Sequence, residues 1–179
     1  YLPIFYGILY AGACAVPING KLHAKEAAWI IAHSGSRLVF AKDAEALRAT
    51  GDIGETPCVT PGTDAFTTMT ATAPLPWPAA MSSDTPAWLF YTSGTTGRPK
   101  GCLQSGHAVA TSGLSFAMHR GFTAAERLLS INPLFHVVGM QQVAAMLACG
   151  GCSVFAGRDD DNAAVLDLVH REACTTTSA

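Results

Sequence analysis

The sequence predicts an α/β fold with layered, mostly parallel sheets and flanking helices. Apolar residues recur at helical spacing in several segments, and short apolar runs of strand length lie between these segments. The two kinds of segment alternate along the chain, and no internal repeat is evident. With 179 residues, 49% of them hydrophobic and 13% charged, the chain has the length of a single domain and enough apolar residues for a core.

The N-terminal part of the chain predicts helices that stop at glycines. Residues 3–11 have helical character up to Gly12, and in residues 23–33 the apolar residues lie three and four positions apart before Gly35. Apolar runs after these glycines predict strands. The expected elements are, in order, helix 3–11, strand 14–18, helix 23–33, strand 37–41 and a short helix 44–50.

Threonine, alanine and proline dominate the middle of the chain. Residues 62–86 are rich in these three types, which predicts an irregular crossing between more regular parts. A short apolar and aromatic run, residues 87–91, follows Pro86 and is typical of a buried strand. This strand leads directly into the most unusual segment of the sequence.

Helical and strand-like segments alternate again after residue 101. The expected elements are helix 106–119, strand 128–131, helix 138–148, strand 152–156 and helix 162–172. Between the last two helices lies Cys149-Gly150-Gly151-Cys152, which has the Cys-x-x-Cys spacing of some metal and redox sites. The two glycines fit the end of a helix and the turn into a strand better, so we expect no metal site here.

The segment 91–101 combines hydroxyl groups, glycines and two cations in eleven residues. Glycines allow the backbone to approach a ligand closely, and hydroxyl groups can donate hydrogen bonds to phosphate oxygens. Arg98 and Lys100 add positive charge, and the segment contains no acidic residue. The hydroxyl groups belong to Thr92, Ser93, Thr95 and Thr96, and the glycines are Gly94, Gly97 and Gly101. This composition predicts a loop that holds a polyphosphate.

Two other interpretations of this loop fit less well. A flexible Gly/Ser/Thr linker would have a similar composition, but the buried strand in front of the loop indicates a fixed position. The loop is not a Walker A motif, because Pro99 precedes the lysine and Gly101 follows it. A Gly-x-Gly-x-x-Gly fingerprint is also absent from the sequence, which argues against a Rossmann-type dehydrogenase.

The eleven residues from Tyr91 to Gly101 resemble the signature loop of the adenylate-forming superfamily, which includes acyl-CoA synthetases, luciferases and peptide-synthetase adenylation domains. Residues 12–19 are similar to the early part of acyl-CoA synthetases. Residues 133–136, followed by Gly139, resemble the next motif of that family. The resemblance therefore extends along the whole chain.

The resemblance implies an acid-thiol ligase of the acyl-CoA synthetase type. In this family a carboxylic acid attacks the α-phosphorus of ATP to give an acyl-adenylate, and a thiol, usually that of coenzyme A, then displaces AMP. ATP, Mg²⁺ and coenzyme A are the implied cofactors, and fatty acid metabolism is an implied setting. The implied phosphate contacts are Thr92, Ser93, Gly94, Thr95, Thr96, Gly97 and Lys100, with Lys100 stabilising charge on the departing pyrophosphate.

Two further residues acquire roles through the resemblance. His136 corresponds to a histidine near the substrate carboxylate or the adenylate, although a lone histidine beside apolar neighbours is more often a packed residue. Lys100 and His136 are thus the candidate catalytic residues. Arg158 lies where some relatives have a basic residue that meets coenzyme A, and a solvated arginine paired with a neighbouring aspartate explains it equally well. His107 fits a structural role.

The resemblance also implies a domain organisation. We expect residues 1–179 to be part of a large N-terminal AMP-binding domain, with the C-terminal part and the small lid domain absent. Segments that the family uses for adenine, Mg²⁺ and ribose are not found in the sequence. We therefore expect this stretch alone to be inactive. A noncatalytic phosphate- or acid-binding module is the alternative.

Charge, N-terminal composition and cysteine content bear on the possible partners and location of the protein and on the state of its cysteines. The net charge is −2 with scattered basic residues, which gives no reason to expect a nucleic-acid partner. Pro3, Gly12 and Pro17 interrupt the uncharged N-terminal stretch, so we expect no membrane span and a cytoplasmic protein. The six cysteines lie mostly in apolar surroundings and fit reduced core residues. The sequence indicates neither the acid nor the oligomeric state.

Overall fold

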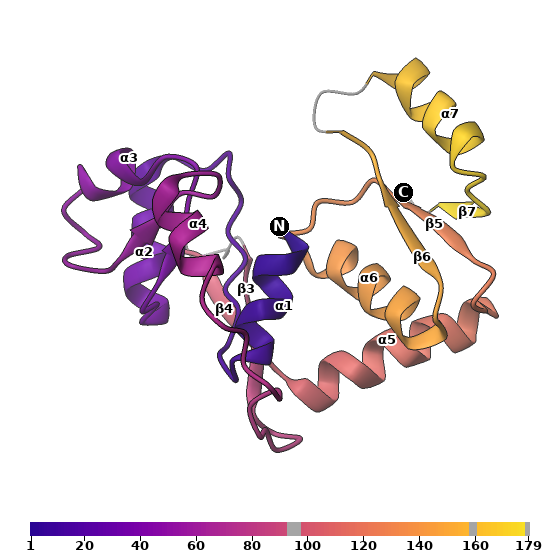
Figure 1. Cartoon of the computed structure of the whole chain (residues 1–179), viewed down its shortest axis with the longest axis horizontal. Coiled ribbons are helices and arrows are strands. Elements are labelled where there is room, and N and C mark those ends of the chain that lie inside the picture. The colour runs from indigo at the N-terminus through magenta and orange to yellow at the C-terminus, as the bar shows by residue number, and fades with distance from the viewer. Residues whose placement is uncertain (93–97, 158–160, 178–179) are drawn as a thin grey trace. The chain divides into compact units, whose positions relative to one another are not determined.

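The computed structural model describes residues 1–92, 98–157 and 161–177 and divides into two compact units (Figure 1). Unit 1 comprises residues 1–81 and 87–103, and unit 2 comprises residues 82–86 and 104–179. The division falls within the segment that precedes the predicted phosphate loop and within the strand that follows it. The sequence, by its length, predicted a single domain without this division.

Unit 1 contains helices α1 to α4 and two pairs of short strands. Its elements are α1 (Leu2–Tyr10), α2 (Ala24–Ser34), β1 (Val39–Phe40), α3 (Ala44–Arg48), β2 (Cys58–Val59), α4 (Asp64–Thr70), most of β3 (Pro86–Thr92) and most of β4 (Lys100–Ser105). Strands β1 and β2 pair in parallel, with Val39 opposite Cys58. The side chains of Ala28, Ile31, Val39, Leu47 and Ile53 form the core beside this pair.

Helix α2 (Ala24–Ser34) lies one residue later than the predicted helix 23–33 and ends before Gly35, as predicted. The ring Nδ1 of His23 accepts a hydrogen bond from the backbone N–H of Lys25 at 3.3 Å, and the carboxylate of Glu26 accepts one from the backbone N–H of His23 at 3.2 Å. These reciprocal bonds satisfy donors that the first turn of a helix leaves free. At the other end Gly35 has φ +65°, the left-handed conformation that glycine adopts without strain.

Strand β3 is held by buried aromatic residues. Trp88 and Phe90 are almost fully buried, and their rings meet edge to face at 5.4 Å between centroids. Phe5 of α1 packs against Trp88 at 5.6 Å. Ala15 pairs with this strand in parallel, since its N–H donates to Ala87 and its carbonyl accepts from Leu89. The predicted buried strand is thus confirmed.

The predicted strand 14–18 is wrong, because only Ala15 forms a bridge in the described part of unit 1. Pro17 has no backbone N–H and cannot continue a ladder. The irregular crossing predicted for 62–86 is also wrong in part, since α4 forms within it. Thr63 caps α4 by accepting from the N–H of Phe66 at 3.5 Å, and the Phe66 ring meets Phe40 edge to face.

Unit 2 contains a three-stranded parallel sheet with helices packed on it. Its elements are α5 (Gly106–Arg120), β5 (Arg127–Ser130), α6 (Val137–Cys149), β6 (Cys152–Phe155), α7 (Asn162–Arg171) and β7 (Thr176–Thr177). The strand order is β6-β5-β7, with Leu128 opposite Ser153 on one side and Thr176 on the other. Helix α6 packs against α5, β5 and β6. Helix α7 packs through Leu168 against Leu129 and Val154. The predicted α/β class with parallel sheets is confirmed.

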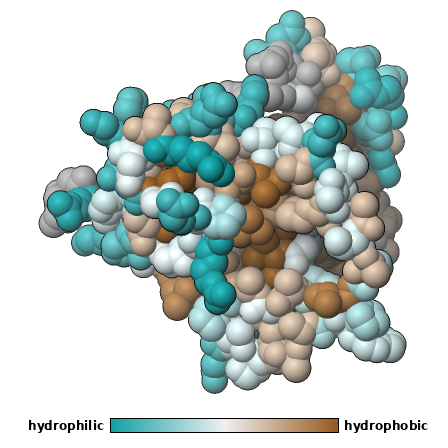
Figure 2. Space-filling model, turned by 60° about the vertical axis from the view of Figure 1, so that its left-hand side comes forward, coloured by the Kyte–Doolittle hydropathy of each residue, from teal (hydrophilic) through white to brown (hydrophobic). Residues whose placement is uncertain are grey.

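Large apolar side chains remain open on the surface of both units. Trp77 and Leu75 in unit 1 are 79% and 55% exposed, and Met118, Leu147 and Leu166 in unit 2 are 72%, 63% and 69% exposed. Brown hydrophobic atoms lie among teal hydrophilic ones on the face that Figure 2 shows. None of the helices in the described ranges combines enough length and apolarity for a bilayer crossing.

Candidate functional site

Strands β3 and β4 carry the two flanks of the predicted phosphate loop. They are hydrogen-bonded neighbours in a two-stranded sheet, so the chain leaves this sheet at Thr92 and returns to it at Lys100. Both of these residues are exposed. The structure therefore places Thr92 and Lys100 in one two-stranded sheet. The predicted contacts Ser93, Gly94, Thr95, Thr96 and Gly97 lie outside the described residues.

The two cations of the loop are available to a ligand. Arg98 and Lys100 are exposed, and within residues 1–92, 98–157 and 161–177 neither of them forms a salt bridge. An ammonium or guanidinium group that is not paired with a carboxylate retains its full attraction for an anion. The flank of the loop at β4 thus carries positive charge that no carboxylate of the described residues neutralises.

Tyr91 ties the end of β3 to α2. Its hydroxyl lies 2.7 Å from Nδ1 of His33, and its ring meets the rings of Trp29 and His33 edge to face at centroid distances of 6.2 and 5.8 Å. Burial raises the pKa of the Tyr91 hydroxyl, so the phenol is neutral at neutral pH. Sequence reasoning did not find this contact, because its two residues lie 58 positions apart and no motif links them.

His136 stands at the start of α6 in unit 2 and is exposed. Its Nδ1 accepts a hydrogen bond from the backbone N–H of Val138 at 3.4 Å, and its own backbone N–H donates to the carbonyl of Pro133 at 3.0 Å. In a neutral ring, an Nδ1 that accepts a bond leaves the proton on Nε2. The ring can therefore donate a hydrogen bond from Nε2 to an oxygen outside the helix.

The turn before His136 lies against the first turn of α6. A Cβ at Gly139 would lie 2.5 Å from the carbonyl oxygen of Pro133 and 2.9 Å from that of Asn132. These distances are too short for any side chain, so only glycine permits the turn to approach the helix so closely. The side-chain amide of Asn132 donates a hydrogen bond to the side-chain oxygen of Gln142, and Gln142 is almost fully buried. Gly139 thus explains the spacing of the motif around His136.

Arg158, His107 and the cysteines are the other residues that the sequence singled out. Arg158 lies outside the described residues. His107 is exposed near the start of α5, and its backbone N–H donates to the carbonyl of Ser83 at 3.0 Å. All six cysteines are free, and Gly150 ends α6 with φ +74° in the left-handed conformation. No group of three or more His, Cys, Asp or Glu side chains in the described ranges could hold a metal ion.

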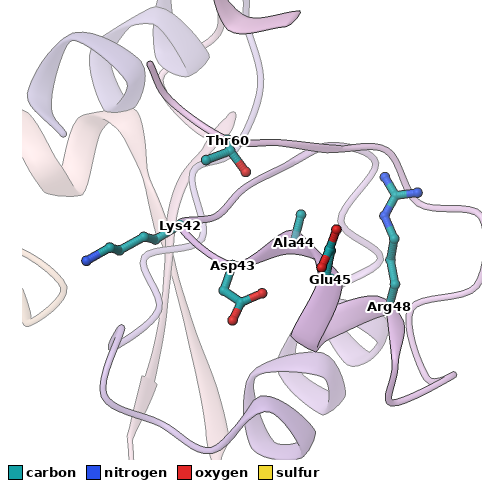
Figure 3. Close-up of a pocket in the computed structure, with 6 residues that line it drawn as sticks. All are labelled: Lys42, Asp43, Ala44, Glu45, Arg48 and Thr60. Atoms are coloured by element: carbon teal, nitrogen blue, oxygen red, sulfur yellow. The ribbon is translucent and has the colours of Figure 1, made fainter. Parts of the chain in front are cut away.

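A cavity of about 590 Å³ in unit 1 contains none of the predicted site residues. It is lined by Lys42, Asp43, Ala44, Glu45, Arg48 and Thr60 (Figure 3). Lys42 extends away from Glu45 and Arg48, so the two cations do not converge on one point. Asp43 caps α3 by accepting from the N–H of Ala46 at 2.9 Å. The lining carries both signs of charge and is poorly suited to a phosphate.

A smaller cavity of about 320 Å³ lies in unit 2, where α5 and α6 pack together. It is lined by Ser112, Ser115, Phe116, His119 and Gln141. The Gln141 amide donates to the Ser112 hydroxyl at 2.7 Å. Sequence reasoning did not single out this hollow, because its residues belong to two helices and to no recognisable motif.

Comparison with known proteins matches residues 1–179 to the family described as AMP-binding enzyme. The chain is 35% identical over 146 residues to the long-chain-fatty-acid–CoA ligase FadD13 of Mycobacterium tuberculosis. The aligned region covers 78% of this chain and 29% of that ligase. It is also similar to the solved N-terminal domain of FACL13 from Mycobacterium tuberculosis, with a TM-score of 0.81, 28% identity, and coverage of 98% of this chain and 46% of that one.

A third similarity is to o-succinylbenzoate CoA synthetase from Bacillus subtilis, solved in complex with its acyl-adenylate intermediate. The TM-score is 0.83 and the identity 28%, with coverage of 98% of this chain and 45% of that one. The chain thus spans less than a third of the length of the curated relative and about half of a solved N-terminal domain.

Proposed function

The chain belongs to the family of AMP-binding enzymes, and from this premise we propose that its protein activates a carboxylic acid with ATP and passes the acyl group to coenzyme A. The acid would attack the α-phosphorus of ATP, releasing pyrophosphate and forming an acyl-adenylate. The thiol of coenzyme A would then attack the acyl carbon and release AMP. Relatives named as CoA ligases, one of them solved with an acyl-adenylate, support this proposal.

The observation that carries the proposal is the pair of exposed flanks around the phosphate loop. Thr92 and Lys100 lie on neighbouring strands, and neither Lys100 nor Arg98 is neutralised by a carboxylate within the described residues. Negative charge grows on pyrophosphate as it departs, and donors already in place stabilise that charge without reorganisation. We assign this role to Lys100 and Thr92, together with Ser93, Gly94, Thr95, Thr96 and Gly97.

His136 has a separate role in this proposal. Its Nδ1 is occupied at the start of α6, so its Nε2–H is the group that would donate to the substrate carboxylate or to the adenylate. A neutral donor at this point orients the acid without neutralising the attacking carboxylate. The catalytic pair is thus Lys100 for the leaving group and His136 for the acid.

The proposed binding of coenzyme A and Mg²⁺ involves fewer residues of this chain. Arg158 is the proposed contact for coenzyme A, since an arginine fork suits a phosphate group. Mg²⁺ would accompany the ATP phosphates as the usual partner of a nucleotide. Because the described ranges offer no cluster of three metal-binding side chains, no step at the ion is assigned to this chain.

We also propose that residues 1–179 are part of an N-terminal AMP-binding domain and that turnover requires a longer protein. The coverage of about half a solved N-terminal domain supports this. The alternative is a noncatalytic phosphate- or acid-binding module, which the same coverage also allows. Fatty acids are one candidate substrate class, since FadD13 is named for them, whereas the Bacillus enzyme is named for an aromatic acid.

ATP–pyrophosphate exchange tests the proposal. The protein that contains these residues is incubated with ATP, labelled pyrophosphate and a panel of fatty, aromatic and short acids. We expect label to enter ATP only when a suitable acid is present. Nucleotide binding without acid-dependent exchange would favour the noncatalytic module instead. Running the 179-residue chain in parallel shows whether exchange requires further polypeptide.

A further inference from the structure

Three aromatic side chains of unit 1 form a cluster at the foot of the phosphate loop. Trp29 and His33 lie one turn apart on α2, and their rings stack with centroids 4.6 Å apart. Tyr91, the penultimate residue of β3, meets both rings edge to face and places its hydroxyl 2.7 Å from Nδ1 of His33. None of these side chains is among the phosphate contacts proposed above.

Tyr91 touches both flanks of the loop. On one side it precedes Thr92 directly in β3. On the other side its ring lies over Gly101 of β4, where an added Cβ would be 3.4 Å from the Tyr91 ring and 3.1 Å from a methyl group of Leu89. Gly101 is the neighbour of Lys100. The position of this one ring therefore affects the backbone at both ends of the loop.

His33 has an exposed side chain on a helix that is packed into the core of unit 1. His33 lies in the last turn of α2. Three other residues of this helix, Ala28, Ile30 and Ile31, are almost fully buried. The stacked Trp29 ring limits the rotation of the imidazole. A hydrogen bond to a side chain on a well-packed helix restrains its partner more than a bond to a mobile group does.

We propose that His33 is a positioning residue for nucleotide binding, because it holds the Tyr91 hydroxyl and thereby fixes where Thr92 and Lys100 leave the sheet. The inference rests on the proposed function and deepens it, since it adds a residue that contacts neither ATP nor the acid. Either partner can be the donor in this hydrogen bond, so the bond survives either tautomer of the imidazole.

A double-mutant cycle in the acid-dependent exchange reaction tests this inference. His33→Ala and Tyr91→Phe each remove one side of the hydrogen bond. We expect each to raise the KM for ATP about three- to tenfold, the range expected for loss of one hydrogen bond, while the KM for the acid changes less than twofold. We expect the double variant to be no worse than the more affected single variant, because both changes break the same contact. His33→Asn places an amide near the position of Nδ1 and should restore most of the ATP affinity.

Two control variants separate positioning from general damage. Tyr10→Phe removes another tyrosine hydroxyl of unit 1, which donates to the Leu75 carbonyl at 3.4 Å. His23→Ala removes the cap of α2 and weakens the same helix at its other end. We expect His23→Ala to lower the urea midpoint while the KM for ATP stays unchanged. Tyr10→Phe should change neither.

The inference is overturned if the effects of His33→Ala and Tyr91→Phe add independently, or if the KM values for ATP and acid rise together. It is also overturned if His23→Ala gives the same rise in KM for ATP. Absence of acid-dependent exchange in the unaltered protein would instead remove the proposed function. In that case the same cycle is measured as affinity for inorganic pyrophosphate, where a coupled loss still supports the positioning role and additive effects reject it.

Discussion

Nδ1 of His136 accepts a hydrogen bond from the backbone N–H of Val138, 3.4 Å away, and this bond makes His136 the cap of α6. The same histidine is the candidate that meets the substrate acid. One side chain therefore has a structural role through Nδ1 and is available for chemistry through Nε2. Replacing it affects both roles at once, so a simple loss of activity in an alanine variant would not separate them.

His136→Ser separates the two roles. Serine is among the best helix caps and would keep the start of α6, but it is too short to reach a ligand that the imidazole meets. We expect the urea midpoint to stay close to that of the unaltered protein while acid-dependent exchange falls about 10- to 100-fold, as for loss of a hydrogen bond to a charged group. His136→Ala should in addition lose about 1 kcal/mol of stability with the cap. Exchange at the original rate in the serine variant would contradict a role for His136 at the acid.

Lys100→Ala tests the leaving-group role. The ammonium group is exposed and unpaired among the described residues, so its removal should disturb the fold little. We expect the rate of exchange to fall about 10²- to 10³-fold, as for loss of one preorganised donor, while the KM for the acid stays nearly constant. Lys42→Ala is the matched control, because Lys42 is another exposed lysine of unit 1. Equal rates for both variants would count against the assignment.

Helix ends could be predicted from the sequence because single glycines determine them. Gly35 and Gly150 both adopt the left-handed conformation at the C-caps of α2 and α6, where a left-handed residue satisfies the last carbonyl groups. The buried strand before the loop was also predictable, since a short run of apolar and aromatic residues directly after a proline is typical of a buried strand. Each of these signals lies within a few consecutive residues, so it can be recognised from the sequence alone.

The short strand β2 and the long-range contacts could not be predicted. Strand β1 lies within the predicted strand 37–41, but β2 spans only Cys58–Val59, and so short a strand leaves no period in the sequence. Strand β4 begins at Lys100 within a glycine-rich, polar stretch that has no strand pattern. The contact between Tyr91 and His33 depends on the packing of α2 against β3, which no residue spacing expresses. Of the predicted site, Thr92, Lys100 and His136 have described positions.

Gly139→Ala tests whether the turn before His136 depends on close approach. A methyl group there would lie 2.5 Å from the Pro133 carbonyl oxygen, which also accepts from the His136 N–H. We expect a loss of about 1–3 kcal/mol in the free energy of unfolding, the usual cost of overpacking, together with weaker exchange as the turn shifts. Gly7→Ala is the matched control. Nothing lies within 4 Å of a Cβ at Gly7 in α1, so alanine should stabilise that helix by about 0.5–1 kcal/mol.

Tyr6 makes stability sensitive to alkaline pH. Its hydroxyl is buried and has no hydrogen-bond partner in the part of the chain that the structure describes, and burial raises its pKa above the ordinary value for tyrosine. A raised pKa in the folded state means that the unfolded chain loses this proton first. The neutral hydroxyl is therefore compatible with folding below about pH 10, and stability falls as the pH rises above that value.

Tyr6→Phe should remove both the cost of burying this hydroxyl and its contribution to the loss of stability at alkaline pH. Since the group is buried without a partner among the described residues, its loss relieves a desolvation cost, and we expect the variant to be as stable as the unaltered protein or up to about 1 kcal/mol more stable at pH 7. As the pH rises above about 10, its stability should decline less steeply than that of the unaltered protein. Urea unfolding at a series of pH values measures both quantities. A steeper decline for Tyr6→Phe than for the unaltered protein would contradict a raised pKa for Tyr6, because only a phenolate that the folded state stabilises could produce that sign.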